Sequence, residues 1–362
     1  MEVSTTYQLL TFYKFVDVEN PKREVKYLKK FCTDIGMRGR IYIGEEGINA
    51  QCTVNFGQKQ ALLWYLEHHD LFNNIGDIEE KSSAVDGHKF PKMIVRYKKE
   101  IVALGEIYKK SEIDKAKFKA SPDELKSLID GENPEKYLII DMRNDYEYRL
   151  GHFKNARPAG TMSFRETETF IEDYRRRAGD NPVYMYCTGG IRCEKLAVML
   201  ERSGMDGVKQ LDGGVIKYVN KFNDGNWLGN LYTFDDRVSV RVGDEQTHTT
   251  IGRCHYSDEP TDEIHNCRYG MCNRQIIALP KEYRRFMGFC SELCAENAVL
   301  DLNVRDVNFD KFDYKALRIS VKNEERTFEE AQKIVSDHLE RELGRVQFNH
   351  KVPVDEILKI EN

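Results

Sequence analysis

The spacing of apolar positions changes along the chain, and over its first third it predicts alternating strands and helices. Strands are favoured where aromatic and β-branched residues gather, and helices where leucines recur on one face, as Leu62, Leu63 and Leu66 do. The expected order is strand 7–17, helix 20–35, two short strands within 40–54 about the turn Gly44-Glu45-Glu46-Gly47, helix 57–70, and strands 93–97 and 100–104. This order predicts a ferredoxin-like α+β sandwich over residues 1–107.

Between residues 120 and 228, short buried strands alternate with helices and predict a doubly wound α/β domain. A helix start, Ser121-Pro122-Asp123-Glu124, combines a serine cap with proline at the first helical position. The apolar strand 137–141 is typical of a parallel sheet covered on both faces. The elements expected after it are helix 166–177, strand 183–186, helix 192–203, strand 208–211 and helix 213–222. We interpret the charged stretch 108–119 as the linker between the two domains.

The last third of the chain has little periodicity until its end. Residues 229–301 are expected to form a cysteine-rich module, whose part from 254 to 294 is loop-like. A charged, partly helical tail is expected over 302–362. It should contain a helix at 327–343, because Thr327 and the glutamates after it look like a capped start and Gly344 ends the pattern.

Composition narrows the partners and the compartment. The formal net charge of −5 gives no overall sign of nucleic-acid binding, so any RNA contact must use local basic patches. The first residues lack the features of a signal peptide, and no apolar run approaches the roughly 20 residues of a membrane helix. We therefore expect a cytoplasmic protein with no membrane partner. Its nine cysteines would stay reduced there, which favours catalysis or metal binding over disulfides.

Cys187 stands between a short apolar strand and a helical pattern that begins near Arg192. Backbone N–H groups and the positive end of a helix dipole at such a turn favour the thiolate, which is the reactive form of cysteine. Gly189 and Gly190 allow the backbone to curl so that its amides point inward. We therefore expect a reactive cysteine; the alternative is a small buried apolar side chain.

Three segments resemble the rhodanese family. They are Asp141-Met142-Arg143-Asn144-Asp145-Tyr146-Glu147 with Gly151-His152-Phe153-Lys154-Asn155-Ala156, the loop from Cys187 to Arg192, and Gly213-Gly214-Val215. The resemblance implies a rhodanese-like fold for the doubly wound domain and a loop that forms a persulfide on Cys187. A short ring of amides fits one sulfur atom better than a phosphate with three oxygens.

A narrower resemblance is to the tRNA uridine-34 hydroxylase family, rhodanese-domain proteins with an N-terminal α+β domain. It is carried by Cys187-Thr188-Gly189-Gly190-Ile191-Arg192-Cys193-Glu194-Lys195, Gly44-Glu45-Glu46-Gly47-Ile48-Asn49-Ala50 and Ser163-Phe164-Arg165-Glu166. The resemblance implies an oxidoreductase that hydroxylates carbon 5 of the wobble uridine to 5-hydroxyuridine, with O2 as co-substrate. It leaves the electron donor open.

Two other functions stay open. One is a sulfurtransferase in which Cys187 carries persulfide sulfur, for example for tRNA thiolation. The other is a non-enzymatic RNA-binding scaffold with a vestigial rhodanese fold, against which the presence of both Cys187 and Arg192 argues.

The residues around Cys187 have expected roles. The loop residues expected to line the active site are Thr188, Gly189, Gly190 and Ile191. Arg192 is expected to hold an anion or a substituent on the sulfur through its guanidinium fork. Cys193 is either a second thiol that resolves a persulfide or disulfide on Cys187, or a helix residue that packs on the sheet. A structural ion-pair and capping set is expected from Asp141, Arg143 and Glu147.

Four cysteines of the C-terminal module have paired spacing, Cys267-x4-Cys272 and Cys290-x3-Cys294. Two pairs about 20 residues apart are typical of a tetrahedral zinc site to which each pair gives two thiolates. A structural zinc is therefore expected; the alternative is a metal-free knuckle. The resembling family tends to have a further cysteine just beyond the position of Cys254. Ser257 stands there, which argues against a second or larger metal centre.

Two basic clusters are candidates for RNA contact. One contains Lys89, Lys92, Arg96, Lys98 and Lys99, and the other Arg268, Arg274, Lys281, Arg284 and Arg285. Aromatic residues such as Tyr97 and Tyr283 interleave them, which suits stacking on unpaired bases. We expect them to bind the anticodon arm of tRNA; the alternative is that each charge run is only a solvated face.

Overall fold

The computed structural model describes residues 7–76, 78–116, 118–160, 171–205, 207–246, 248–344 and 348. It forms two compact units. The first contains Met1–Tyr148 and His152–His248, and the second contains Arg149–Gly151 and Thr249–Asn362. None of the helices in the described ranges is long and apolar enough to cross a membrane.

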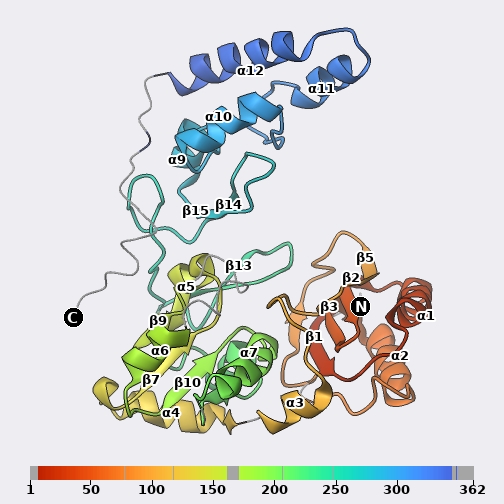
Figure 1. Ribbon diagram of the computed structural model, residues 1–362, viewed down its shortest axis with the longest axis vertical. Coiled ribbons are helices and arrows are strands. Elements are labelled where there is room, and N and C mark those ends of the chain that lie inside the picture. Colours follow the sequence, from red (N-terminus) through yellow and green to blue (C-terminus); the bar gives the residue numbers. More distant parts are fainter. Residues whose placement is uncertain are drawn as a thin grey trace, which may run out of the picture. The chain divides into compact units, whose positions relative to one another are not determined.

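The N-terminal part of the first unit is a five-stranded sheet with two helices on one face (Figure 1). Its strands are β1 (Tyr7–Phe15), β2 (Arg38–Gly44), β3 (Gly47–Asn55), β4 (Ser83–Val85) and β5 (Met93–Tyr97), in the order β4-β1-β3-β2-β5. Strand β3 is antiparallel to β1 and β2, and β4 is antiparallel to β1. With α1 (Pro21–Asp34) and α2 (Phe56–Glu67), this confirms the ferredoxin-like prediction, and β5 extends the sheet parallel to β2.

One prediction for the segment after β5 is wrong. Residues 100–104 form bends rather than a strand, because the Glu100 carboxylate accepts the backbone N–H groups of Leu104 and Gly105 and closes a turn. The apolar residues there, including Leu104, serve burial and not a sheet. The stretch 108–119, expected to be a linker, contains helix α3 (Lys110–Lys115) and ends in strand β6 (Lys119–Ala120).

The rest of the first unit is built on the predicted parallel sheet. Its strands are β6, β7 (Leu138–Asp141), β9 (Ala156–Pro158), β10 (Val183–Tyr186) and β11 (Lys209–Leu211), in the order β6-β11-β10-β7-β9. Ile140 and Met185 pack in one core cluster with the helices α6 (Ile171–Ala178) and α7 (Ile191–Arg202). The neighbouring strand residues Ile139 and Tyr186 pack in another with α4 (Pro122–Asp130) and α8 (Gly214–Phe222). Successive residues thus cover opposite faces, which confirms the doubly wound arrangement.

Several short elements were not predicted. They are α5 (Asp145–Leu150), the 3-10 helix η1 (Pro134–Lys136), β8 (Gly151–Phe153), β12 (Trp227–Tyr232) and β13 (Ser239–Arg241). Strands β12 and β13 form an antiparallel pair. Helix α6 accounts for the last part of the helix expected at 166–177. Residues 161–170, with the motif at 163–166, lie outside the described residues.

The second unit joins the cysteine-rich segment and the C-terminal helices. It contains the antiparallel pair β14 (Ile264–Asn266) and β15 (Gln275–Ile277) and the helices α9 (Pro280–Arg285), α10 (Glu292–Asp301), α11 (Tyr314–Lys322) and α12 (Phe328–Leu343). The helix predicted at 327–343 is confirmed as α12, and Thr327 forms a capping box with Glu330. Helix α12 packs against α10 and α11, and Ala298, Leu317 and Val335 share one buried cluster (Figure 1). Helices α11 and α12 of the tail are therefore part of the core of this unit.

Candidate active site

The loop from Cys187 to Arg192 lies where a parallel strand leads into a helix. Cys187 directly follows β10 and is fully buried, and α7 begins at Ile191. Gly190 has a φ of 98°, and its backbone N–H donates to Cys187 Sγ at 3.2 Å. A Cβ at Gly190 would lie 2.7 Å from Tyr13 Oη, so both the left-handed φ and this contact require glycine. The loop therefore has the strand-to-helix setting that the sequence indicated.

The surroundings of Cys187 favour its thiolate. Burial raises the pKa of this thiol, but a hydrogen bond from the Cys193 side chain, the charge of Arg192 and backbone N–H groups outweigh burial and lower the pKa to about 5. The pKa of Cys193 is raised well above its usual value, by burial and by the same hydrogen bond. These shifts favour a thiolate at Cys187 and a neutral thiol at Cys193 at neutral pH.

We expect Cys187 to react with iodoacetamide at mildly acidic pH. Its alkylation rate should follow the thiolate fraction, rise through a pH of about 5 and be level by neutrality. An ordinary thiol of pKa near 8.5 would still gain rate above neutral pH. Peptide mass spectrometry after timed alkylation measures both the rate and the site. Cys32, whose pKa burial raises to about 12, is the internal control and should stay unmodified. A midpoint for Cys187 above neutrality would contradict the thiolate.

The guanidinium of Arg192 is held by two side chains beside the loop. Its Nη1 donates to Glu147 Oε2 at 2.7 Å, and its Nη2 donates to Glu147 Oε1 at 2.9 Å and to Thr188 Oγ1 at 3.0 Å. Burial acts to raise the pKa of the Glu147 carboxyl, but the charge of Arg192 and its hydrogen bonds hold that pKa below its usual range. Arg192 therefore places a fixed positive charge next to Cys187 and ties α7 to α5.

Replacing Arg192 with lysine should lower kcat/KM at least tenfold, which is roughly 1.4 kcal/mol of transition-state stabilisation. An ammonium keeps the charge but cannot reproduce the two parallel hydrogen bonds to Glu147. Steady-state kinetics with thermal unfolding of the same samples would separate lost catalysis from lost stability. Wild-type turnover in the lysine variant would reduce Arg192 to a structural role.

The predicted structural ion-pair set divides into two parts. Arg143 Nε donates to Asp141 Oδ1 at 2.9 Å, and both side chains are fully buried. Glu147 accepts the backbone N–H of Asn144 at the start of α5 and also reaches Arg192. The second pair was missed because 45 residues separate its partners, so no local spacing indicates it.

Lys195 connects the active-site helix to the N-terminal sheet. Its fully buried ammonium donates to Glu46 Oε1 at 3.1 Å, to Glu100 Oε2 at 2.7 Å and to Val102 O at 3.0 Å. Glu46 belongs to the β2–β3 turn, so segments 44–50 and 187–195, which both carry the family resemblance, meet at this point. Removing one partner of a buried ion pair is strongly destabilising, so this junction fixes the sheet against the Cys187 loop.

A cavity of about 390 Å³ opens on the Cys187 loop within the first unit. The loop contributes Cys187, Thr188, Gly189, Ile191 and Arg192 to its wall. The opposite contributions come from the N-terminal sheet and the segment after β12, and include Tyr13, Arg40, Tyr42, Asn49 and Phe234. Sequence reasoning missed this second group, because the pattern of a strand does not say which other part of the chain its side chains meet.

The predicted RNA-contact residues lie on β5 and beside it. Lys92, Arg96, Lys98 and Lys99 are all exposed. Arg96 Cζ and Lys98 Nζ lie 5.8 Å and 5.6 Å from the centroid of the Tyr42 ring, which lines the Cys187 cavity. This cluster therefore reaches the edge of the cavity. The second cluster is not wholly a surface feature, because Arg268 is buried and pairs with Asp310 at 2.5 Å.

The four predicted metal ligands converge in the second unit. The Sγ atoms of Cys267, Cys272, Cys290 and Cys294 all lie within 4.8 Å of one another, with 3.9 Å between Cys272 and Cys290 and 3.5 Å between Cys290 and Cys294. Tetrahedral zinc with Zn–S bonds of about 2.3 Å requires sulfurs roughly 3.8 Å apart, so these residues can hold a metal of that kind. Cys254 is not a member of the set; its Sγ accepts the backbone N–H of Leu279.

Comparisons with known proteins cover most of the chain. Residues 7–101 match the UPF0176 acylphosphatase like domain, residues 121–221 the rhodanese-like domain and residues 228–295 the rhodanase C-terminal family. A protein of Bacillus velezensis is 34% identical over 293 residues, which are 80% of this chain and 89% of that protein. Proteins of Staphylococcus epidermidis (35% over 295 residues, 80% and 89%) and Chlamydia pneumoniae (34% over 296 residues, 80% and 88%) are similar to the same extent. All three are named tRNA uridine(34) hydroxylase.

Proposed function

Because this chain belongs to the tRNA uridine(34) hydroxylase family, we propose that it hydroxylates carbon 5 of uridine 34 in tRNA, with O2 as co-substrate. The observation that carries the proposal is the Cys187 thiolate in the wall of a cavity of about 390 Å³. We favour hydroxylation over transfer of persulfide sulfur, because the relatives that match four-fifths of the chain have the hydroxylase name.

The cavity suits a pyrimidine that has left the base stack. Tyr13, Tyr42 and Phe234 offer aromatic surface, and Arg40 and Arg192 offer positive charge. Proteins read single-stranded RNA loops by stacking splayed bases on aromatic side chains, and an enzyme that modifies a base must expose it first. Uridine 34 lies in such a loop, the anticodon loop, so we place its uracil ring against Cys187.

Chemically, the Cys187 thiolate forms a bond to C6 of the uracil, and the C5–C6 double bond opens to an enolate. C5 of the enolate then attacks O2, and a hydroperoxide forms on C5. A thiol reduces this hydroperoxide: one oxygen stays on C5 as the hydroxyl group, and the other passes to sulfur as a sulfenic acid. Loss of the C5 proton and cleavage of the S–C6 bond restore the double bond and release 5-hydroxyuridine.

We assign the reducing thiol to Cys193, which is fully buried in the same core cluster as Cys187. The freed Cys187 thiolate attacks the Cys193 sulfenic acid, so that a disulfide forms and water leaves. The two thiols supply two electrons, and the two atoms of O2 end in the product and in water. A thiol reductant from outside the protein must then restore both cysteines.

The test is a reaction of purified protein with unmodified tRNA in air and without reductant. We expect at most one 5-hydroxyuridine per chain, and one Cys187–Cys193 disulfide for each, counted by nucleoside and peptide mass spectrometry. A thiol reductant should convert this single turnover into many. Repeated turnover without reductant would exclude Cys193 as the electron source. Complete absence of 5-hydroxyuridine under both conditions would contradict the function.

Charge reversal at Lys98 and Lys99 together, by Lys98→Glu and Lys99→Glu, should weaken tRNA binding. Both side chains are exposed, and Lys98 stands over the Tyr42 ring at the cavity. If each contacts one phosphate of a single-stranded loop, the slope of log affinity against log salt should fall by about 1.4. Salt-dependent filter binding measures both effects.

The matched control replaces Lys322 and Lys333 with glutamate. These lysines are exposed on the C-terminal helices, beyond residue 295 where the family matches end, and their replacement should change binding little. Loss of binding in the control with binding kept in the Lys98/Lys99 variant would place the RNA on a different surface.

In the second unit we propose structural zinc, bound by Cys267, Cys272, Cys290 and Cys294. Bound there, the ion would tie the segment between β14 and β15 to the first turn of α10. A tRNA substrate also places the protein in the cytoplasm.

A further inference from the structure

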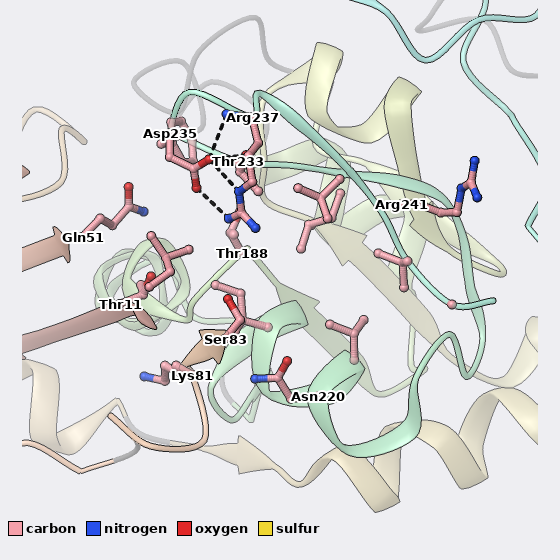
Figure 2. A pocket seen from close by; sticks show the side chains of 18 of the residues that line it. Thr11, Gln51, Lys81, Ser83, Thr188, Asn220, Thr233, Asp235, Arg237 and Arg241 are labelled. Atoms are coloured by element: carbon pink, nitrogen blue, oxygen red, sulfur yellow. Dashed lines mark hydrogen bonds and ion pairs between the residues drawn. The ribbon is translucent and has the colours of Figure 1, made fainter. Parts of the chain in front are cut away.

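A second pocket, of about 250 Å³, adjoins the Cys187 cavity in the first unit (Figure 2). Thr11, Gln51, Thr188 and Phe234 line both spaces. The two spaces therefore lie on either side of the same side chains. The roles proposed so far for the Cys187 site do not use this space.

Apolar side chains form part of the wall of the second pocket. Ile216 and Val219 of α8, Leu231 of β12, and Val240 and Val242 in and after β13 contribute to it. The polar groups around it include the amides of Gln51, at the left in Figure 2, and of Asn220, at its lower side. Asn220 Nδ2 donates to Glu80 O at 2.7 Å and to Ser82 O at 3.2 Å, which fixes its orientation. A volume below the roughly 300–1,000 Å³ of drug-sized sites suits one flat base.

The lining has charged side chains of both signs. It contains three cations, Lys81, Arg237 and Arg241, and one carboxylate, Asp235. Asp235 is engaged by Arg237, with Nε–Oδ1 at 2.8 Å and Nη2–Oδ2 at 2.7 Å (Figure 2). Lys81 is buried, with its Nζ 4.7 Å from the centroid of the Tyr13 ring, and Arg241 forms an exposed ion pair with Glu245. Apolar side chains beside amides, with an exposed arginine at the rim, suit a base attached to a phosphate.

We propose that the second pocket binds the base of a nucleotide next to the target uridine in the same RNA loop, with a flanking phosphate at Arg241. The inference rests on the proposed function, since it takes the target uridine to lie in the Cys187 cavity. Phe234, which lines both spaces, separates the two bases and offers ring surface to each. Two bases held on either side of one ring would keep the loop splayed while C6 stays at Cys187.

A variant that fills the pocket tests this. Val219→Trp adds a large side chain from α8, and Val219→Ala is its control at the same position. The ligand is an anticodon stem–loop RNA, either intact or with an abasic site on one side of uridine 34. We expect Val219→Trp to weaken binding of the intact RNA about tenfold or more, and Val219→Ala to change it little. Alkylation of Cys187 should be unaffected in both.

Coupling between the variant and the RNA decides the question. One of the two abasic RNAs should bind wild-type protein as weakly as the intact RNA binds Val219→Trp. The abasic site and the substitution together should lower the affinity no further than either does alone. The proposal would be overturned if the abasic site and the substitution lowered the affinity by independent factors that multiply. It would also be overturned if Val219→Trp bound the intact RNA as tightly as wild-type protein does. If coupling is present but no RNA is hydroxylated, the pocket assignment stands and the proposed function fails. Should Val219→Trp not fold, Arg241→Gln at the exposed rim must lower the salt slope by about 0.7, and an unchanged slope would overturn the phosphate contact.

Discussion

Cys187→Ser is expected to abolish 5-hydroxyuridine formation while the fold stays intact. Serine is nearly isosteric and can still accept the hydrogen bond that Gly190 donates to the sulfur. Its hydroxyl, however, stays protonated at neutral pH, whereas the pKa of Cys187 is lowered to about 5. Loss of the nucleophile should lower the rate at least a thousandfold, or about 4 kcal/mol. Nucleoside mass spectrometry of tRNA from cells that have only the variant measures this.

The control for Cys187→Ser is Cys32→Ala, a change at a buried cysteine of the N-terminal core. It should keep activity and cost stability only through the lost packing. Wild-type levels of 5-hydroxyuridine in the Cys187→Ser strain would remove Cys187 from the chemistry. Thermal unfolding of both proteins shows whether any loss comes from the fold.

Cys290→Ser should release the metal and unfold much of the second unit, but leave the first unit folded. Structural zinc sites contribute apparent binding free energies of about 10–16 kcal/mol, comparable with the whole stability of a domain, about 5–15 kcal/mol. The Sγ atom of Cys290 lies within 4 Å of two other ligand sulfurs, so its removal takes away a ligand that is close to both. Metal analysis and hydrogen exchange over residues 254–344 measure the two effects.

Cys254→Ser is the matched control for this change. Cys254 belongs to the same buried cluster but not to the tetrad, and a serine oxygen could still accept the N–H of Leu279. It should retain about one metal per chain. Equal metal loss in both variants, or no metal in wild-type protein prepared without chelator, would contradict the tetrad as a zinc site.

Much of the fold was predictable, because its main elements have local signals. The start of α1 at Asn20-Pro21, the turn between β2 and β3, and the capping box of α12 follow from residues a few positions apart. The strand–loop–helix around Cys187 is also local. The paired cysteine spacing was local as well, and its four sulfurs do meet.

What the sequence could not predict depends on contacts between distant segments. Lys195 looks like an ordinary helix residue, and only the fold brings it to Glu46 and Glu100. The same holds for Tyr13, whose hydroxyl donates to Glu194 across 181 residues. The strand predicted over residues 100–104 was wrong for a related reason. Apolar residues that are buried under a turn have the same composition as a strand. The cavity and the pocket beside it exist only once these segments are assembled.

The most direct measurement uses isotopically heavy O2 in ordinary water. Purified protein, unmodified tRNA and a thiol reductant are mixed under the labelled gas, and nucleosides are analysed by mass spectrometry. We predict that wild-type protein forms 5-hydroxyuridine at position 34 whose new oxygen is heavy, and that Cys187→Ser does not. Light oxygen in the product, or heavy product formed equally well without Cys187, would contradict it.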